Sequence, residues 1–379
     1  MANKLDISQL DFDGIKDNLK TFLKQQDEFT DYDFEGSGMN ILLDVLAYNT
    51  HYLGYNANML ANEMFLDSAD QRSSVVSLAK QVGYTPRSAS SSKATIDVLV
   101  NNGSGSSITM ARGTKFTSTV DGTSYSFVNN ADVSVSPVDG VYKFSNLDIF
   151  EGTYLNFKYT ANTSDQDQRF IIPNDNVDTT TLTVKVQNSS SDSTTNTYTL
   201  AQGITGLDST SEVYFLNEVE NGRFEVYFGD GVLGKAIADG NIVILDYITC
   251  NRDEPNGATT FTLSGNVGGF TNVTITTVDN AANGDGPESI ESIKFNAPRD
   301  FTSQDRAVTA DDYKVLVKSL FANAQSVQVY GGEDAATPDY GKVYISIKAK
   351  SGTNLTQLTK DNLVKSLKSF AVASVTPVI

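Results

Sequence analysis

The sequence predicts a multidomain α+β protein with three parts. These are an N-terminal helical arm or bundle at 1–87, one or more all-β domains at 88–280, and a small α+β sandwich at 281–379. Two changes in the hydrophobic period predict this division: a helical period gives way to strict alternation, which then gives way to a mixed pattern. A chain of 379 residues is long enough for several domains that each have a core.

The N-terminal part predicts one amphipathic helix and then a helix without a polar face. Ile15 and later apolar residues recur at helical spacing behind Asp11, which is a suitable N-cap. Ser37 predicts the start of a second, long helix that runs through Met64 and carries apolar side chains on nearly every side. A helix that is apolar all round must be covered all round.

The cover for this second helix must come from other helices, because the N-terminal part is too short to enclose it alone. We infer partner helices from a second copy of the chain or from another protein. A self-contained bundle of the first helices is the other interpretation. We expect the interface to contain the apolar residues Ile15, Leu19, Phe22, Leu42, Leu46, Leu53, Met59 and Phe65.

The remaining sequence predicts strands and then a mixed module. Short alternating runs between Ser88 and about Val278 are separated by Gly, Asn and Asp, which fits one all-β domain or two stacked ones. The last part predicts the order helix, strand, strand, helix, strand, and Thr309 begins its first helix with Asp312 as the capping-box acid. Because the sequence stops in an apolar strand, we expect the natural protein to continue beyond residue 379 or this end to need a partner strand.

Composition excludes several classes of function. The net charge of −18, from 28 basic and 46 acidic side chains, disfavours nucleic acid and anionic membranes as partners. A single cysteine, Cys250, and a single histidine, His51, exclude an internal disulfide and a Cys/His zinc site. We expect no catalytic residue, no cofactor and no metal.

The segment FGDGVLG places Gly229, Gly231 and Gly234 in a G-x-G-x-x-G pattern after a strand. A dinucleotide site needs a helix next, but a short polar stretch and another strand follow. We therefore interpret the segment as a β-hairpin in which glycine supplies positive φ.

Acidic residues offer two further candidate sites. A calcium loop that starts at Asp279 would need Asp or Asn where Ala281 stands, which weakens that interpretation. Asp230, Asp239 and Asp246 could supply the paired carboxylates of a glycosidase, although hairpin turns favour Asp for conformational reasons.

Longer segments carry a family resemblance. They include FTDYDFEGSGMNILLDVLAYNT and NMLANEMFLDSADQRSSVVSLAKQVGYTPRS near the start, RFIIPNDNVDTTTLTVKVQNS and FGDGVLGKAIADGNIVILDYITCN in the β part, and GPESIESIKFNAPRDFTSQDRAVTADDYKVLV near the end. With these segments the chain resembles the baseplate wedge proteins of T-even-like contractile-tailed bacteriophages, within the wider baseplate J-like group.

The resemblance implies a structural role without catalysis. The N-terminal helices would enter a bundle with a larger wedge protein, and each wedge would hold a second copy of this chain. The other domains would form part of an inner ring around the baseplate hub, contact small wedge subunits, and pass a conformational switch to sheath contraction. The protein would be assembled in the host cytoplasm and reside in the virion, in the tail baseplate.

The resemblance also marks individual positions. Gly229, Gly231 and Gly234 match the J-like glycine segment. A second signature is matched by Arg299, Arg306, Thr309, Asp312 and Tyr313. Two interpretations of the arginines remain open: they donate hydrogen bonds to carboxylates or carbonyls at a domain junction or neighbour, or they are simply exposed.

Two other functions are compatible with the composition. A β-rich fibre or adhesin-like protein of the virion would bind host glycans, although the absence of Trp weakens this hypothesis and the 17 Tyr keep it open. An acidic carbohydrate-cleaving enzyme would need two carboxylates close together in one cleft.

Overall fold

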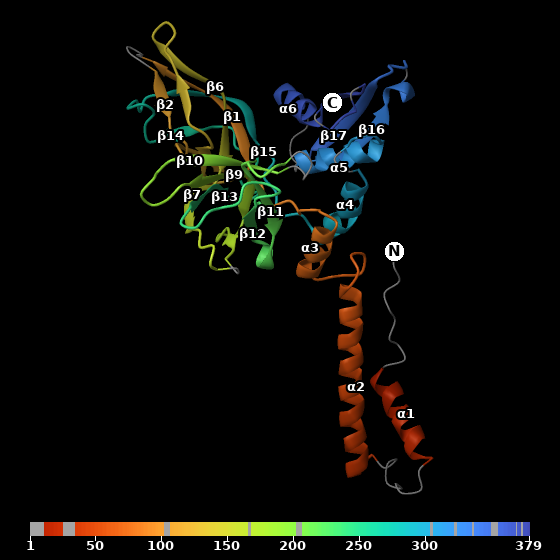
Figure 1. Cartoon of the computed structure of the whole chain (residues 1–379). Helices are drawn as coiled ribbons and strands as arrows, with labels where there is room; N and C mark the ends of the chain where they lie inside the picture. Colours follow the sequence, from red (N-terminus) through yellow and green to blue (C-terminus); the bar gives the residue numbers. More distant parts are fainter. Residues whose placement is uncertain are drawn as a thin grey trace. The chain divides into compact units, whose positions relative to one another are not determined.

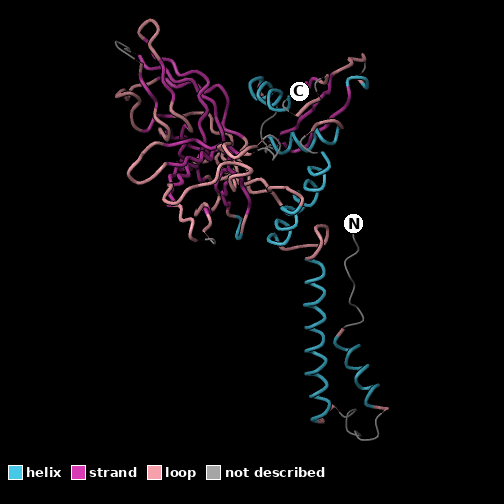
Figure 2. The backbone as a smooth tube through the Cα atoms, in the orientation of Figure 1, coloured by secondary structure: helices cyan, strands magenta, loops and turns pink. Residues whose placement is uncertain are grey.

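The computed structural model confirms the predicted α+β class (Figure 1). It describes residues 11–25, 35–101, 107–165, 168–201, 207–303, 306–321, 324–335, 337–349, 355–368, 370–372 and 374–379. The chain divides into two compact units, Met1–Gln81 and Val82–Ile379, which are described separately below. Figure 2 shows helices throughout the first unit, whereas the second unit combines strands and helices.

The first unit contains α1 (Phe12–Leu23), α2 (Gly38–Glu63) and α3 (Arg72–Gln81). Both predicted caps are present: Asp11 accepts a hydrogen bond from the Phe12 N–H, and Ser37 Oγ accepts one from the Asn40 N–H at 3.0 Å. We call this unit the arm. No described helix of the chain is both long and apolar enough to cross a membrane.

The second unit begins with a six-stranded sheet of order β14-β3-β4-β6-β1-β15. Its paired neighbours are antiparallel, and its core contains large side chains such as Phe116, Phe127 and Ile149, all fully buried. The strands are β1 (Lys93–Asn101), β3 (Lys115–Val120), β4 (Thr123–Asn129), β6 (Val141–Glu151), β14 (Thr262–Ser264) and β15 (Thr274–Ala282), with a separate pair formed by β2 (Ile108–Met110) and β5 (Val133–Val135).

A seven-stranded sheet of order β7-β13-β9-β10-β11-β12-β8 has its own core around Val226, Leu245 and Tyr247. All its strands lie between β6 and β14 in the sequence, so this sheet is an insertion within the six-stranded one. The strands are β7 (Thr153–Thr160), β8 (Phe170–Ile171), β9 (Val177–Gln187), β10 (Thr195–Leu200), β11 (Val213–Glu218), β12 (Phe224–Phe228) and β13 (Ile242–Thr249). We call the two sheets together the β body.

A single residue, Gly152, separates the last strand before the insertion, β6, from the first strand within it, β7. Its φ is +130°, and a Cβ at this position would lie 2.1 Å from the carbonyl oxygen of Thr249. Only glycine fits both conditions without displacing backbone. The passage between the two sheets therefore depends on this residue.

The chain continues into a C-terminal module made of α4 (Ile290–Ser303), α5 (Ala310–Leu320), β16 (Ala324–Gly331), β17 (Lys342–Ala349), α6 (Gln357–Lys368) and β18 (Thr376–Val378). From α5 onward this is the predicted order. β17 pairs antiparallel with β16 and parallel with β18, and residues of α5 and α6 share a core with the sheet. Thr309 and Asp312 form the expected capping box.

Candidate functional site

The arm presents a large apolar surface on its longest helix. Along and just after α2, large apolar side chains are between 40% and 68% exposed, which is unusual for a folded protein and typical of an interaction site. We call this set the α2 apolar surface; it consists of Ile41, Leu42, Val45, Leu46, Tyr48, Tyr52, Leu53, Tyr55, Met59, Leu60, Met64 and Phe65.

Within the arm, packing between α1 and α2 buries a narrow strip of α2. Leu43 and Ala47, one turn apart, are buried, as is Ile15 of α1, and Lys16 forms an ion pair with Asp44 across the two helices. The prediction that Ile15 belongs to an outward interface is therefore not supported by its position, because helical periodicity identifies an apolar residue but not what covers it. Phe22 is 61% exposed.

The charges of α2 are used within the arm. The helix has two carboxylates, Asp44, which pairs with Lys16, and Glu63, which accepts hydrogen bonds from the Asp70 and Gln71 N–H groups. Burial acts to raise the pKa of Glu63, but hydrogen bonds from the Ser74 side chain and these N–H groups lower it overall. The outward surface is consequently rich in aliphatic side chains and Tyr, including the ring pair Tyr48–Tyr52 with centroids 4.8 Å apart.

The loop with Gly229, Gly231 and Gly234 is compact but is not a hairpin. β12 pairs with β11 and β8, whereas the next strand, β13, pairs with β7 and β9, so the loop crosses between distant strands of the sheet. The glycines are required locally: Gly231 and Gly234 have φ of +86° and +90°, and a Cβ on Gly229 would lie 2.4 Å from the Gly234 backbone. The hairpin prediction was wrong because local glycine spacing specifies a turn but not strand pairing.

Four of the other predicted residues surround one cleft. A cavity of about 450 Å³ is lined by Arg299, Thr302, Arg306, Val308, Thr309, Asp311 and Asp312. The Arg299 guanidinium stacks 3.5 Å from the centroid of the Phe295 ring and donates to the Phe295 carbonyl. Asp312 accepts hydrogen bonds from the Val308 and Thr309 N–H groups. Tyr313, the fifth predicted residue, is fully buried in the module core.

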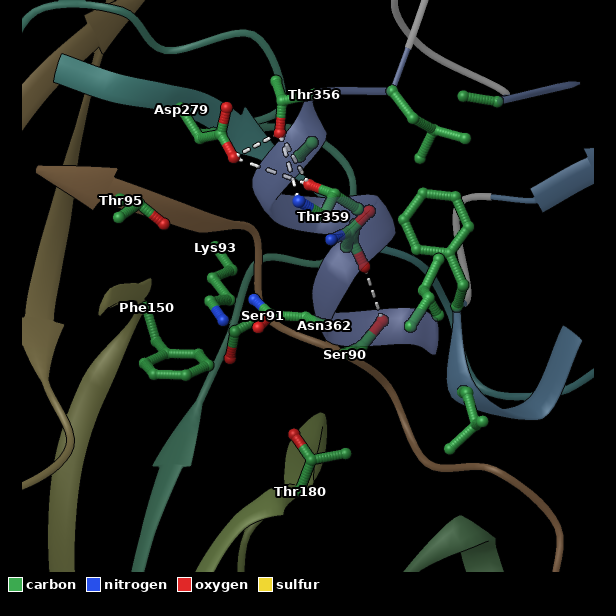
Figure 3. A pocket seen from close by; sticks show the side chains of 18 of the residues that line it. Ser90, Ser91, Lys93, Thr95, Phe150, Thr180, Asp279, Thr356, Thr359 and Asn362 are labelled. Carbon is green, nitrogen blue, oxygen red and sulfur yellow. Dashed lines mark hydrogen bonds between the residues drawn. The ribbon is translucent and has the colours of Figure 1, made fainter. Parts of the chain in front are cut away.

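A second cleft was missed at the sequence level (Figure 3). Its volume is about 590 Å³, and it lies between the β body and α6. Asp279 of β15 accepts a hydrogen bond of 2.6 Å from Thr356 and a longer one of 3.5 Å from Thr359. The residues come from segments far apart in the chain, so no spacing in the sequence could have indicated this cleft.

The candidate carboxylates serve structural roles. Asp246 is buried and contacts Lys185 at 3.2 Å and Arg112 at 3.5 Å, while Asp230 caps its own turn by accepting from the Val232 and Leu233 N–H groups. Asp239 accepts from the Thr163 N–H. Among the described residues, no group of His, Cys, Asp or Glu is arranged to hold a metal ion. Cys250 is buried, and burial raises the pKa of its thiol to about 11.

The exposed apolar surface of α2 is typical of a subunit that assembles with other proteins. Comparisons with known proteins agree. Three family models match the chain in order: "Baseplate wedge protein gp6-like, helical domain" over 11–84, "Bacteriophage baseplate wedge protein gp6, third domain" over 156–256, and "Baseplate structural protein gp6, C-terminal domain I" over 309–379. Together these ranges cover more than half of the chain.

A curated relative, "Baseplate wedge protein gp6" of Enterobacteria phage T4, is 31% identical over 402 residues. The alignment covers 97% of this chain and 58% of the relative, so the chain spans less than two thirds of that protein's length. A chain of the anti-feeding prophage baseplate, solved by cryo-EM, is also similar, with 10% identity, a TM-score of 0.34, and coverage of 96% of this chain and 77% of that chain.

The family models and the phage T4 relative support a structural baseplate wedge component, located in the virion at the tail baseplate. Three separate segments of the chain match domains of the phage baseplate wedge protein gp6.

Proposed function

We propose that this chain joins its wedge through the arm and contributes its remaining domains to an inner ring around the baseplate hub. In this proposal the α2 apolar surface enters a helical bundle with a larger wedge protein and with a second copy of the chain. The ring then transmits the conformational switch that leads to sheath contraction. The observation that carries the proposal is the exposed apolar surface of α2.

The chemistry of this surface favours helices as partners. Its exposed residues recur three, four and seven positions apart along α2: Val45 and Leu46 lie three and four residues after Leu42, and Leu53 lies seven residues after Leu46. This is the pattern that packs against another helix. Burying each large apolar side chain contributes about 1.5–3 kcal/mol, so a few of them suffice for stable association. With Asp44 and Glu63 already bound inside the arm, burial of the surface leaves neither carboxylate without a partner.

The other parts supply weaker, polar contacts. We assign the Arg299–Arg306 cleft to a carboxylate or carbonyl of a neighbouring wedge protein, because guanidinium N–H groups donate hydrogen bonds to both kinds of oxygen. Small wedge subunits and the hub are the proposed partners of the β body and the C-terminal module. The domain limits 1–87, 88–280 and 281–379 belong to the same proposal, as does membership in the wider J-like group.

Co-expression with the wedge proteins tests the arm. Leu46→Asp or Leu53→Asp places a charge on the α2 apolar surface, and we expect either change to abolish co-purification with the larger wedge protein while the β body still folds. Val138→Asp is the matched control, because Val138 is 71% exposed but lies in the β body. Normal co-purification of the Leu46 and Leu53 variants would contradict the proposal.

A further inference from the structure

The segment that follows the arm is paired with the segment that leads into the C-terminal module. Residues 84–92 run between the arm and β1, and residues 283–288 run between β15 and α4. Ser90 and Asp285 form an antiparallel bridge with backbone hydrogen bonds of 3.0 and 3.2 Å, and the Glu288 N–H donates to the Arg87 carbonyl at 3.0 Å. The Arg87 guanidinium also forms an ion pair of 2.9 Å with Asp285. We call these two segments the joint.

The Glu288 carboxylate connects both sides of the joint. From the arm side it accepts hydrogen bonds from the Tyr84 hydroxyl, at 2.8 and 2.9 Å, and from the Arg87 N–H at 3.1 Å. From α4 it accepts hydrogen bonds from the Ser292 hydroxyl at 2.6 Å and from the Asn296 side-chain amide at 2.9 Å. Glu288 is 5% exposed, so these contacts are made largely out of water, where hydrogen bonds to a carboxylate are strong.

The joint is also fixed to the β body. Ser88 Oγ accepts a hydrogen bond from the Thr179 N–H at 3.0 Å, and the Ser91 N–H donates to Asp178 at 2.8 Å. Both serines are buried. Residues 88–92 are therefore held against the inserted sheet, whereas residues 84–87 are held against the start of α4. Movement of the arm would reach α4 through Tyr84 and Arg87, before the chain reaches its attachment to the sheets.

We propose that the joint couples the arm to the C-terminal module, with Glu288 as the positioning residue that makes α4 respond to occupation of the arm. This inference rests on the proposed function, in which the arm binds wedge helices and the other domains transmit a switch. It adds the route: the signal passes from residues 84–87 through one carboxylate into α4.

The test is hydrogen exchange in the full chain, alone and bound to the larger wedge protein. Glu288→Ala removes the shared acceptor. Glu291→Ala is the matched control, since Glu291 lies nearby on α4 with a side chain that is 87% exposed. In the wild type we expect binding at the arm to change amide exchange in residues 84–87 and in the first two turns of α4. In Glu288→Ala binding should persist and the change in α4 should disappear, whereas Glu291→Ala should behave as the wild type.

The outcomes separate this inference from the proposed function. Failure of the wild type to bind the wedge protein contradicts the proposed function, and the joint is then judged on the free chain. There, Glu288→Ala should raise exchange about tenfold at both Arg87 and α4, because one lost acceptor releases donors on both sides. If Glu288 had a purely structural role, Glu288→Ala would raise exchange in α4 by the same factor in the free and the bound chain, and the change in α4 on binding would persist. That result, or exchange at Arg87 that does not change, overturns the inference. Glu288→Gln, which keeps the size and one acceptor oxygen, replaces Glu288→Ala if that variant does not fold.

Discussion

The arm and the β body place the same types of residue in opposite environments. In the arm, Tyr52 and Leu53 are 51% and 61% exposed, while in the β body Tyr247 and Leu245 are almost fully buried. Conversely, no charged residue in the described part of the arm is buried, whereas the β body buries Glu151, Asp178 and Asp246. The β body thus covers its large apolar side chains within its own fold, whereas the arm leaves many of them exposed, and our proposal is that other helices cover them.

The buried carboxylates of the β body are tied to backbone turns and chain crossings. Glu151 accepts hydrogen bonds from both the backbone and side chain of Asn251, and Asp178 accepts them from Ser91 and Thr180. Burial raises the pKa of both groups despite these bonds. These contacts fix the geometry of the chain, although burying the two carboxylates costs free energy of desolvation.

The largest expected effect follows replacement of Gly152 at the passage between the sheets. Gly152→Val adds a Cβ to a residue with φ of +130° and brings it against the Thr249 carbonyl, so we expect a loss of more than about 4 kcal/mol in the free energy of unfolding. Urea unfolding followed by near-ultraviolet circular dichroism measures this loss. The helical signal of the arm should remain.

Gly122→Val is the control for this prediction. Gly122 also has a positive φ, of +83°, but a Cβ there meets no atom within 4 Å. Its cost should be limited to backbone strain, about 1–2 kcal/mol. Equal losses at the two glycines would show that strain, and not the close approach of the two sheets, makes Gly152 necessary.

Local features of the fold were predictable from the sequence, and chain pairing was not. Asp11, Ser37 and Thr309 cap their helices as expected, because capping depends on a few adjacent residues. Alternation predicted strands correctly, but it does not state which strands pair, so neither the insertion after Gly152 nor the crossing made by the glycine loop could be read from it.

The candidate sites show the same limit. The α2 apolar surface was predictable because α2 has apolar residues on nearly every side, and a single neighbouring helix cannot cover all of them. The burial of Ile15 depends on how α1 packs against α2, which periodicity does not give. The clefts beside Arg299 and beside Asp279 each combine segments that meet only in the folded chain.

Removing a buried charge should be the second largest effect. Asp246→Ala leaves Lys185 and the partly buried Arg112 without this carboxylate, and we expect the β body to lose about 3–5 kcal/mol. Urea unfolding at neutral pH measures the loss. Asp230→Ala, which removes only a turn cap on the surface, should cost about 1 kcal/mol. A small effect at Asp246 would mean that the β body does not depend on its buried charges.

Within the arm, two adjacent leucines separate folding from assembly. Leu43 is 3% exposed and Leu42 is 57% exposed. Leu43→Ala should destabilise the free arm by about 2–3 kcal/mol, seen as lower helicity on heating. Leu42→Ala should change the stability of the free chain by less than about 0.5 kcal/mol but weaken binding to the larger wedge protein. If Leu42→Ala lowered helicity as much as Leu43→Ala, the α2 apolar surface would already be packed in the free chain.

The smallest expected effect is a pH dependence of the free energy of unfolding. It distinguishes the interior of the β body, which contains carboxylates, from the apolar interior of the arm. Burial acts to raise the pKa of Asp246, but hydrogen bonds from Asn156, Tyr154 and Lys185 lower it overall. A carboxyl whose folded-state pKa is depressed stabilises the fold above its unfolded pKa of about 3.9 and loses that contribution as the pH falls through the folded-state value. The difference in unfolding free energy between the wild type and Asp246→Asn should therefore shrink as the pH falls below about 4, because the protonated acid resembles the amide. The difference between the wild type and Leu43→Ala should stay constant over the same range, since burial of a leucine involves no proton. A constant difference for Asp246→Asn would show that this carboxylate stabilises the β body by shape and not by charge.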